Sequence, residues 1–89
     1  MAMKIIFGSQ YRKQYKKLAE SDKEAVKKTI SVFSGEPFDR RLRNHPLKGE
    51  FSGLRSISAG FDLRIIFREE DSYAIVEFIQ VGSHSDLYE

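Results

Sequence analysis

The sequence predicts an α+β fold, in which a four-stranded, mostly antiparallel sheet carries a helical hairpin on one face, in the order β-α-α-β-β-β. Two patterns lead to this prediction. Between residues 10 and 34 apolar side chains recur every three or four positions, the period of an amphipathic helix. Between residues 61 and 68 they alternate, the period of a strand with one buried face. Strands joined by short turns pair antiparallel, which places the chain in the α+β class.

Length and composition limit the possible classes of protein. The 89 residues, 40% of them hydrophobic, suffice for one domain over residues 1–89 with a small core. The absence of cysteine excludes disulfides and thiolate metal sites. No apolar run approaches the roughly 20 residues that cross a bilayer, and no signal-peptide pattern follows Met1. We therefore expect a cytoplasmic protein without a membrane partner.

The first half of the chain predicts one strand and two helices. Residues 3–7 form a short apolar strand that ends at Gly8, after which Ser9 can cap a helix over residues 10–20. Tyr11, Tyr15 and Leu18 lie on one stripe of that helix. Ser21 and Glu24 have the spacing of a capping box, which predicts the start of a second helix. Its buried face holds Val26, Thr29, Ile30 and Phe33, and Gly35 and Pro37 end it.

The second half predicts three strands. Residues 36–50 read as an exposed loop, and residues 51–58 form the second strand. After a turn at Ala59-Gly60, residues 61–68 place Phe61, Leu63, Ile65 and Phe67 on one face, and Asp62, Arg64, Ile66 and Arg68 on the other. Residues 69–72 form a hairpin turn. Residues 73–81 are apolar on both faces except at Glu77 and Gln80, as in a central strand.

Charge is divided unevenly along the chain. Residues 1–48 hold 12 Lys and Arg against 5 Asp and Glu, whereas residues 49–89 hold 3 against 8. A basic half suits contact with phosphates or with an acidic protein, although solvated helix faces produce the same pattern.

The two histidines stand among other groups that bind or move charge. His45 is followed by Lys48, and His84 closes a segment that also holds Arg55, Asp62 and Arg64. Histidine exchanges protons near neutral pH, and cations attract an anionic substrate. The set therefore predicts acid/base chemistry at a phosphate, and RNA is the substrate that this suggests.

Four motifs in order carry a family resemblance. They are His45-Pro-Leu-Lys-Gly49, Gly53-Leu-Arg55, Asp62-Leu-Arg-Ile-Ile-Phe67 and Val81-Gly-Ser-His-Ser-Asp-Leu-Tyr88. Over its whole length the chain resembles the RelE/ParE superfamily of bacterial type II toxins, and within it the YafQ-like ribosome-dependent messenger-RNA endonucleases. The resemblance implies the same RelE-like fold.

The resemblance also implies which residues form the active site. In YafQ-like members two histidines and an aspartate line it, and these map onto His45, Asp62 and His84. Where those relatives place another histidine four residues before the aspartate, this sequence has Ser58. In the RelE branch basic residues and a terminal tyrosine do the work, and these correspond to Lys48, Arg55, Arg64 and Tyr88.

The implied reaction is attack of a ribose 2′-OH on the adjacent phosphorus, without a cofactor or a metal. Asp62 or His45 takes the 2′-OH proton, His84 protonates the leaving 5′ oxygen, and the cations stabilise the charged transition state. The implied partners are a cognate antitoxin protein and messenger RNA in the ribosomal A site.

Several structural alternatives stay open on the sequence alone. His45 can be a solvated loop residue, His84 can cap the terminal turn, and Asp62 can pair with Arg64 or end a hairpin. Two other functions also stay open. One is poisoning of DNA gyrase, as in ParE-like toxins, and the other is a catalytically weak remnant that only binds an antitoxin.

Overall fold

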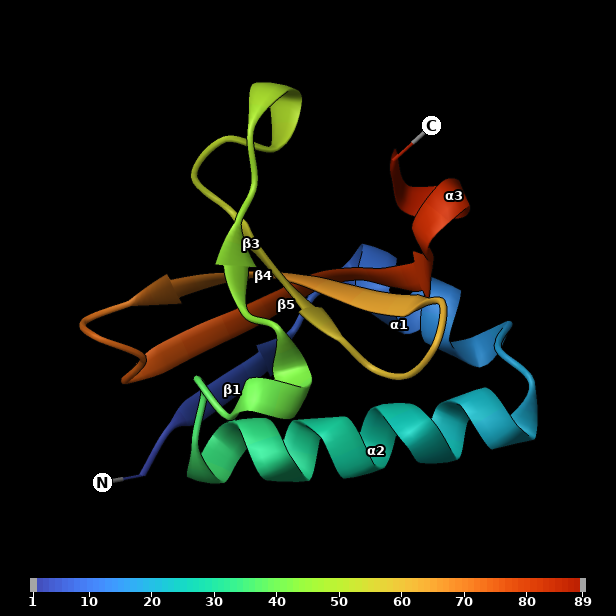
Figure 1. Cartoon of the computed structure of the whole chain (residues 1–89), viewed down its shortest axis with the longest axis horizontal. Helices are drawn as coiled ribbons and strands as arrows, with labels where there is room; N and C mark the ends of the chain where they lie inside the picture. The colour runs from blue at the N-terminus through green and yellow to red at the C-terminus, as the bar shows by residue number, and fades with distance from the viewer. Residues whose placement is uncertain (1, 89) are drawn as a thin grey trace.

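The computed structural model describes residues 2–88, which form one sheet with helices on both sides. The elements follow in the order β1 (Lys4–Phe7), α1 (Ser9–Lys16), α2 (Glu20–Gly35), the short 3₁₀ helix η1 (Arg40–Leu42), β2 (His45–Pro46), the 3₁₀ helix η2 (Gly49–Phe51), β3 (Arg55–Ser58), β4 (Leu63–Glu70), β5 (Ile75–Ser83) and α3 (His84–Tyr88). In Figure 1 α2 runs beneath the sheet, whereas α3 rises from its other side. The α+β class is confirmed.

The sheet has five strands in the order β1-β5-β4-β3-β2. All neighbours pair antiparallel except β1, which runs parallel to β5. β5 therefore lies between β1 and β4, as its apolar faces predict. The prediction of four strands missed β2, because two residues bounded by a proline carry no periodic pattern. The first strand, expected to be buried, lies at the sheet edge with Ile6 and Phe7 partly exposed.

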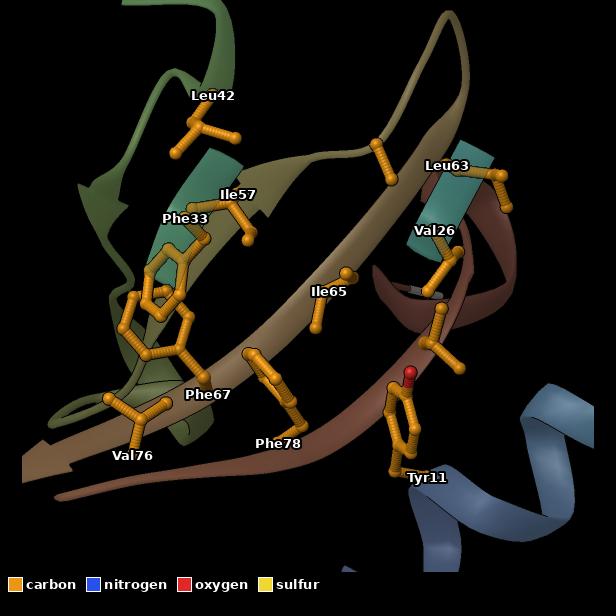
Figure 2. Close-up of a cluster of buried hydrophobic side chains, with 12 residues drawn as sticks. Tyr11, Val26, Phe33, Leu42, Ile57, Leu63, Ile65, Phe67, Val76 and Phe78 are labelled. Carbon is orange, nitrogen blue, oxygen red and sulfur yellow. The ribbon is translucent and has the colours of Figure 1, made fainter. Parts of the chain in front are cut away.

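The hydrophobic core lies between the sheet and helices α1 and α2 (Figure 2). Phe33 of α2 is fully buried, and its ring centroid lies 4.9 Å from that of Phe67 on β4 and 5.7 Å from that of Phe78 on β5. Tyr11 attaches α1 to the same cluster, where burial raises the pKa of its hydroxyl to about 12. The helical stripes of the sequence thus face the core as predicted.

Both predicted helix caps are wrong. α1 begins at Ser9 with Gly8 at its N-cap, and α2 begins at Glu20 with Ala19 at its N-cap; neither helix has a side-chain cap. Ser21 lies inside the first turn of α2. Acidic side chains of that turn, Glu20 and Asp22, complement the positive end of the helix dipole, so the helix starts without a capping hydroxyl.

β4 follows its predicted alternation except at its start. Leu63, Ile65 and Phe67 are buried in the core, whereas Arg64 and Arg68 point to the other face. Phe61, expected to join the core side, lies in the 59–62 turn and is fully exposed. β4 also runs to Glu70, so the turn falls at Asp71, Ser72 and Tyr73, all with positive φ.

None of the helices in residues 2–88 is long and apolar enough to span a bilayer.

Candidate active site

The sheet face that points away from α1 and α2, here called the distal face, gathers most of the predicted site residues. Residues paired directly across antiparallel strands share a face. His45 pairs with Ser56, and Ser56 with Ile66. Arg64 pairs with Ser58 on one side and Gly82 on the other. Because Ile65 and Val81 face the core, their alternating neighbours Arg64 and Gly82 lie on the distal face.

The helix α3 places His84 at the end of β5. The Ser83 hydroxyl accepts a hydrogen bond from the Asp86 backbone N–H at 3.1 Å, which caps the helix. The backbone N–H of His84 donates to the Asp62 carbonyl at 2.9 Å, so the two predicted catalytic residues sit opposite each other. Leu87 covers Gly82: a Cβ there would lie 3.4 Å from the leucine side chain. The helix is thereby held against the distal face.

Tyr88 contacts residues of three different segments on this face. Its hydroxyl donates to the hydroxyl of Ser56 on β3 at 3.0 Å. Its ring centroid lies 4.7 Å from the His84 ring and 5.8 Å from the Phe51 ring of η2. Tyr88 therefore joins the C-terminal helix, the β2–β3 segment and the sheet. Ser83 supplies the cap, so the alternative that His84 caps this turn is wrong, and the exposed His84 ring packs on Tyr88 instead.

His45 is exposed on the edge strand β2. Its ring Nδ1 lies 2.7 Å from the backbone carbonyl of Arg43. A carbonyl oxygen can only accept, so Nδ1 must carry the proton in this contact, and the lone pair of the neutral ring is then on Nε2. The contact fixes the ring in a tautomer in which Nε2 can accept a proton.

Arg64 and Asp62 do not form an ion pair, nor does either join any other salt bridge within residues 2–88. The Arg64 guanidinium folds over the 60–63 turn instead, where its Nη1 donates to the Leu63 carbonyl at 2.9 Å. Neutral carbonyls do not cancel its charge. The site thus keeps both a cation and an exposed carboxylate available, and the alternative of an Asp62–Arg64 pair is wrong.

Arg55 is the predicted site residue that the structure places elsewhere. It pairs with Phe67, a core residue, so its side chain leaves β3 on the side of α1 and α2. Its Nε donates to the Asn44 side-chain oxygen at 2.8 Å, and its guanidinium lies 5.6 Å from the centre of the Phe38 ring. Alternation along a strand separates it from Ser56 and Tyr88. We therefore treat Arg55 as a residue that supports the loop before β2.

Lys48 lies in the segment between β2 and β3, which projects from the sheet on the same side as α3 (Figure 1). It is exposed and precedes η2. Its position leaves the ammonium group able to approach a ligand on the distal face.

Sequence reasoning missed four residues that build the site. Ser56 is fully buried beneath Tyr88, and its alternation with Ile57 was a usable signal. Ser83 and Asp86 have the S-x-x-D spacing of an N-terminal helix cap, a second signal that went unused. Phe51, which contacts Tyr88, lies in an irregular segment and carried no signal.

Comparison with known proteins agrees with this geometry. A family model described as the bacterial toxin YafQ of type II toxin-antitoxin systems matches residues 3–89. The chain belongs to this family. A comparison with curated protein sequences gives no match.

Solved structures of YafQ and of related toxins share the fold. The crystal structure of YafQ from E. coli strain BL21(DE3) superposes with a TM-score of 0.81 at 22% identity, covering 98% of this chain and 99% of that one. The toxin-antitoxin complex DinJ-YafQ of E. coli gives 0.79 at 23% identity over the whole of both chains. The toxin-antitoxin complex RelBE2 of Mycobacterium tuberculosis gives 0.77 at 24% identity, covering 93% of this chain and 92% of the other. The arrangement of strands and helices is therefore that of YafQ and RelE toxins.

Proposed function

We propose that this toxin is an endoribonuclease that cleaves messenger RNA in the ribosomal A site and so inhibits translation. The observation that supports the proposal is the arrangement around α3. Tyr88 packs on His84 and donates to Ser56 of the distal face, and the His84 N–H binds the Asp62 carbonyl. An acid/base group, a carboxylate and, two residues further along the chain, the Arg64 cation thus come from neighbouring residues at this end of the sheet. Membership of the YafQ toxin family supports the same activity.

The reaction is a transesterification within the RNA. A base removes the proton of the ribose 2′-OH, and the 2′ oxygen forms a bond to the adjacent phosphorus. The bond from phosphorus to the 5′ oxygen breaks, and protonated His84 gives its proton to that oxygen. The products are a 2′,3′-cyclic phosphate and a 5′-OH. Arg64 and Lys48 stabilise the charge that gathers on the phosphoryl oxygens, and Tyr88 holds the His84 ring in place. The step requires no metal or cofactor.

Two residues are candidates for the base. Asp62 lies directly opposite His84 at the backbone. His45 presents Nε2 in the tautomer that accepts a proton. Strands lie about 4.8 Å apart, so the three strand spacings between β2 and β5 separate His45 from the end of β5, where His84 follows, by about 14 Å measured along the sheet. This separation favours Asp62, because base and acid act on two oxygens of the same phosphate.

Substitution separates these candidates. Asp62→Asn and His45→Gln keep the shape of each side chain, and we expect the variant of the true base to lose about 100-fold or more in cleavage rate. Equal small losses for both variants would contradict a base at either position.

The decisive experiment maps 5′ ends on messenger RNA in a translating extract. Wild-type protein should produce new 5′-hydroxyl ends at in-frame codons. The His84→Ala variant should produce fewer of these ends, by about 100-fold or more. Neither should cut without ribosomes. Intact messages together with halted DNA supercoiling would replace the proposal with gyrase poisoning. No effect on either would leave an inert antitoxin-binding protein.

A modified substrate tests the acid specifically. When sulfur replaces the bridging 5′ oxygen, the leaving group departs without protonation. On ribosomes programmed with such a message, His84→Ala should recover most of the lost rate, whereas the base variant should not. A base variant that recovers equally would show that His84 is not the acid.

We also propose a cognate antitoxin as the protein partner. Its support is the family itself, defined by type II toxin-antitoxin systems, and the related DinJ-YafQ structure is a toxin-antitoxin complex. Co-expression of this toxin with the gene next to its own should restore growth. Growth that stays arrested would show that the neighbouring gene does not encode the antitoxin.

A further inference from the structure

A basic turn between α2 and β2 is not used by the proposed chemistry. We call residues 38–43 the arginine turn. A shallow hollow of about 870 Å³ opens on it, lined by Glu36, Phe38, Asp39, Arg40, Arg41 and Arg43. Three arginines within four positions, Arg40, Arg41 and Arg43, are exposed to solvent.

Two of the three arginines have no carboxylate partner in the part of the chain that the structure describes. Arg41 is bound by both carboxylate oxygens of Asp39, at 2.8 and 2.9 Å. These hydrogen bonds lower the pKa of Asp39 to about 2, so the pair stays ionised at neutral pH. Arg40 and Arg43 are exposed and enter no salt bridge within residues 2–88. Each guanidinium offers a planar fork of donors that matches a phosphate.

An aromatic ring stands beside these cations. Phe38 is 57% exposed. The ring is nevertheless held in place: the edge of Tyr73 lies against it at 5.3 Å between centroids, and the Arg55 guanidinium lies 5.6 Å from its centre. A fixed, exposed ring beside arginines is the arrangement that stacks on nucleic-acid bases.

The turn is ordered before any ligand arrives. The Asp39 carboxylate accepts the Arg41 backbone N–H at 3.0 Å and thereby caps η1. The Asn44 amide group donates to the Pro37 carbonyl at 3.0 Å and to the Tyr73 hydroxyl at 3.1 Å. Binding there would cost little ordering of the backbone.

The turn also continues into the active site. The Arg43 carbonyl accepts the hydrogen bond from His45 Nδ1, so the last arginine adjoins the β2 edge of the distal face. We propose that the arginine turn is a second RNA contact, which binds ribosomal RNA through its phosphates and one stacked base while the distal face holds the messenger. This inference rests on the proposed ribosomal function. The hollow is lined by charged groups, which favours RNA over the apolar segment of a protein partner.

Salt dependence of binding tests the phosphate contacts. Binding of the His84→Ala protein to purified 30S subunits is measured between 50 and 300 mM salt, where each phosphate contact adds about 0.7 to 0.9 to the slope of log affinity against log salt. Arg40→Gln with Arg43→Gln should lower that slope by about 1.5. The matched change Lys13→Gln with Lys16→Gln, on exposed α1 positions, should leave it unchanged. Equal slopes for the two double variants would overturn the proposal.

Stacking has a different signature. Phe38→Leu keeps an apolar side chain but removes the ring, and should weaken binding about 5-fold or more without changing the salt slope. A thermal melt checks that the variant is folded. Unchanged affinity in a folded variant would overturn the stacking contact.

Relief of the internal ion pair provides a gain-of-binding test. Asp39→Asn frees the Arg41 guanidinium and should raise the salt slope by about 0.7 to 0.9. Asp71→Asn, which removes the same charge in the β4–β5 turn, is the control and should leave the slope unchanged. A rise that is equal in both variants would reduce the effect to net charge and overturn the assignment.

Poly-L-glutamate serves as the acidic polypeptide probe. If the Arg40/Arg43 double variant loses affinity for it as steeply as for 30S subunits, the turn is a surface for an acidic protein and the RNA proposal fails. Because binding is measured without cleavage, the two proposals fail separately. If the toxin binds 30S subunits through the arginine turn but cuts no messenger RNA, only the proposed nuclease activity is wrong. If it cuts messenger RNA but its 30S binding does not depend on Arg40 and Arg43, only the inference about the arginine turn is wrong.

Discussion

Phe33 and Phe61 show how far position outweighs residue type in this chain. Phe33 is fully buried against Phe67 and Phe78, whereas Phe61 is fully exposed in the turn before β4. Helical periodicity assigned Phe33 to the core, and strand alternation assigned Phe61 to the core side of its strand. The turn overrides the pattern at Phe61, because the Ala59 N–H bonds the Leu63 carbonyl and closes the hairpin before the strand begins.

The two phenylalanines should respond oppositely to truncation. Phe33→Ala should lower the free energy of unfolding by about 3 to 5 kcal/mol, through lost burial and the cavity that remains. Phe61→Ala should change it by no more than about 0.5 kcal/mol. Chemical denaturation measures both, and a large loss at Phe61 would mean that the exposed ring packs against something in solution.

The identities of the site residues were largely accessible from the sequence, but their grouping was not. His45, Asp62, Arg64, His84 and Tyr88 were named from motifs. The pairing of the strands puts His45 and Arg64 on one face, and a backbone hydrogen bond joins His84 to Asp62 at the end of the sheet. Arg55 was named by the same reasoning and lies on the other face. The difference is one residue of register, since every step along a strand reverses the face, and the sequence left the start of β3 uncertain.

At the scale of elements, the C-terminal helix decides whether the site exists. α3 has only five residues, too few to be stable alone, and its position depends on the Ser83 cap and the Tyr88–Ser56 bond. The sequence signalled a capping box twice. At Ser21 the helix had already begun, whereas the Ser83 hydroxyl caps α3, because a cap matters only where the preceding chain is still extended.

Removing the cap should therefore affect both stability and activity. Ser83→Ala should lower the free energy of unfolding by about 1 kcal/mol and reduce cleavage, since His84 follows directly. Ser85→Ala is the matched control, because Ser85 is exposed and makes no side-chain hydrogen bond within residues 2–88. Unfolding curves and 5′-end mapping on the two variants give the comparison, and identical behaviour would refute a role for the cap.

For the whole molecule, the sequence predicted the layers but not the pairing of the first strand with the last. Four of the five strands, the helical face and the central place of β5 follow from periodicity. The parallel pairing of β1 with β5 does not, because it joins segments about 70 residues apart and no local pattern specifies a partner at that distance. Gly8 lies at this junction, with its N–H bonded to the Phe78 carbonyl at 2.9 Å.

Gly8 should be intolerant of any side chain. A Cβ there would lie 2.9 Å from the Phe78 carbonyl oxygen, so Gly8→Ala should cost about 1 to 3 kcal/mol by forcing β1 and α1 away from β5. Gly35→Ala is the comparison, because nothing lies within 4 Å of that position at the end of α2. It should be neutral or stabilise by about 0.5 to 1 kcal/mol. Similar melting temperatures for both variants would contradict the close approach.

The central position of β5 also has a meaning for synthesis. Among the five strands, the one that both β1 and β4 need is the last to be translated, and His84 follows it directly. Until β5 has been made, β1 has no strand to pair with and the sheet cannot be completed. The same stretch of synthesis thus completes the sheet and delivers His84.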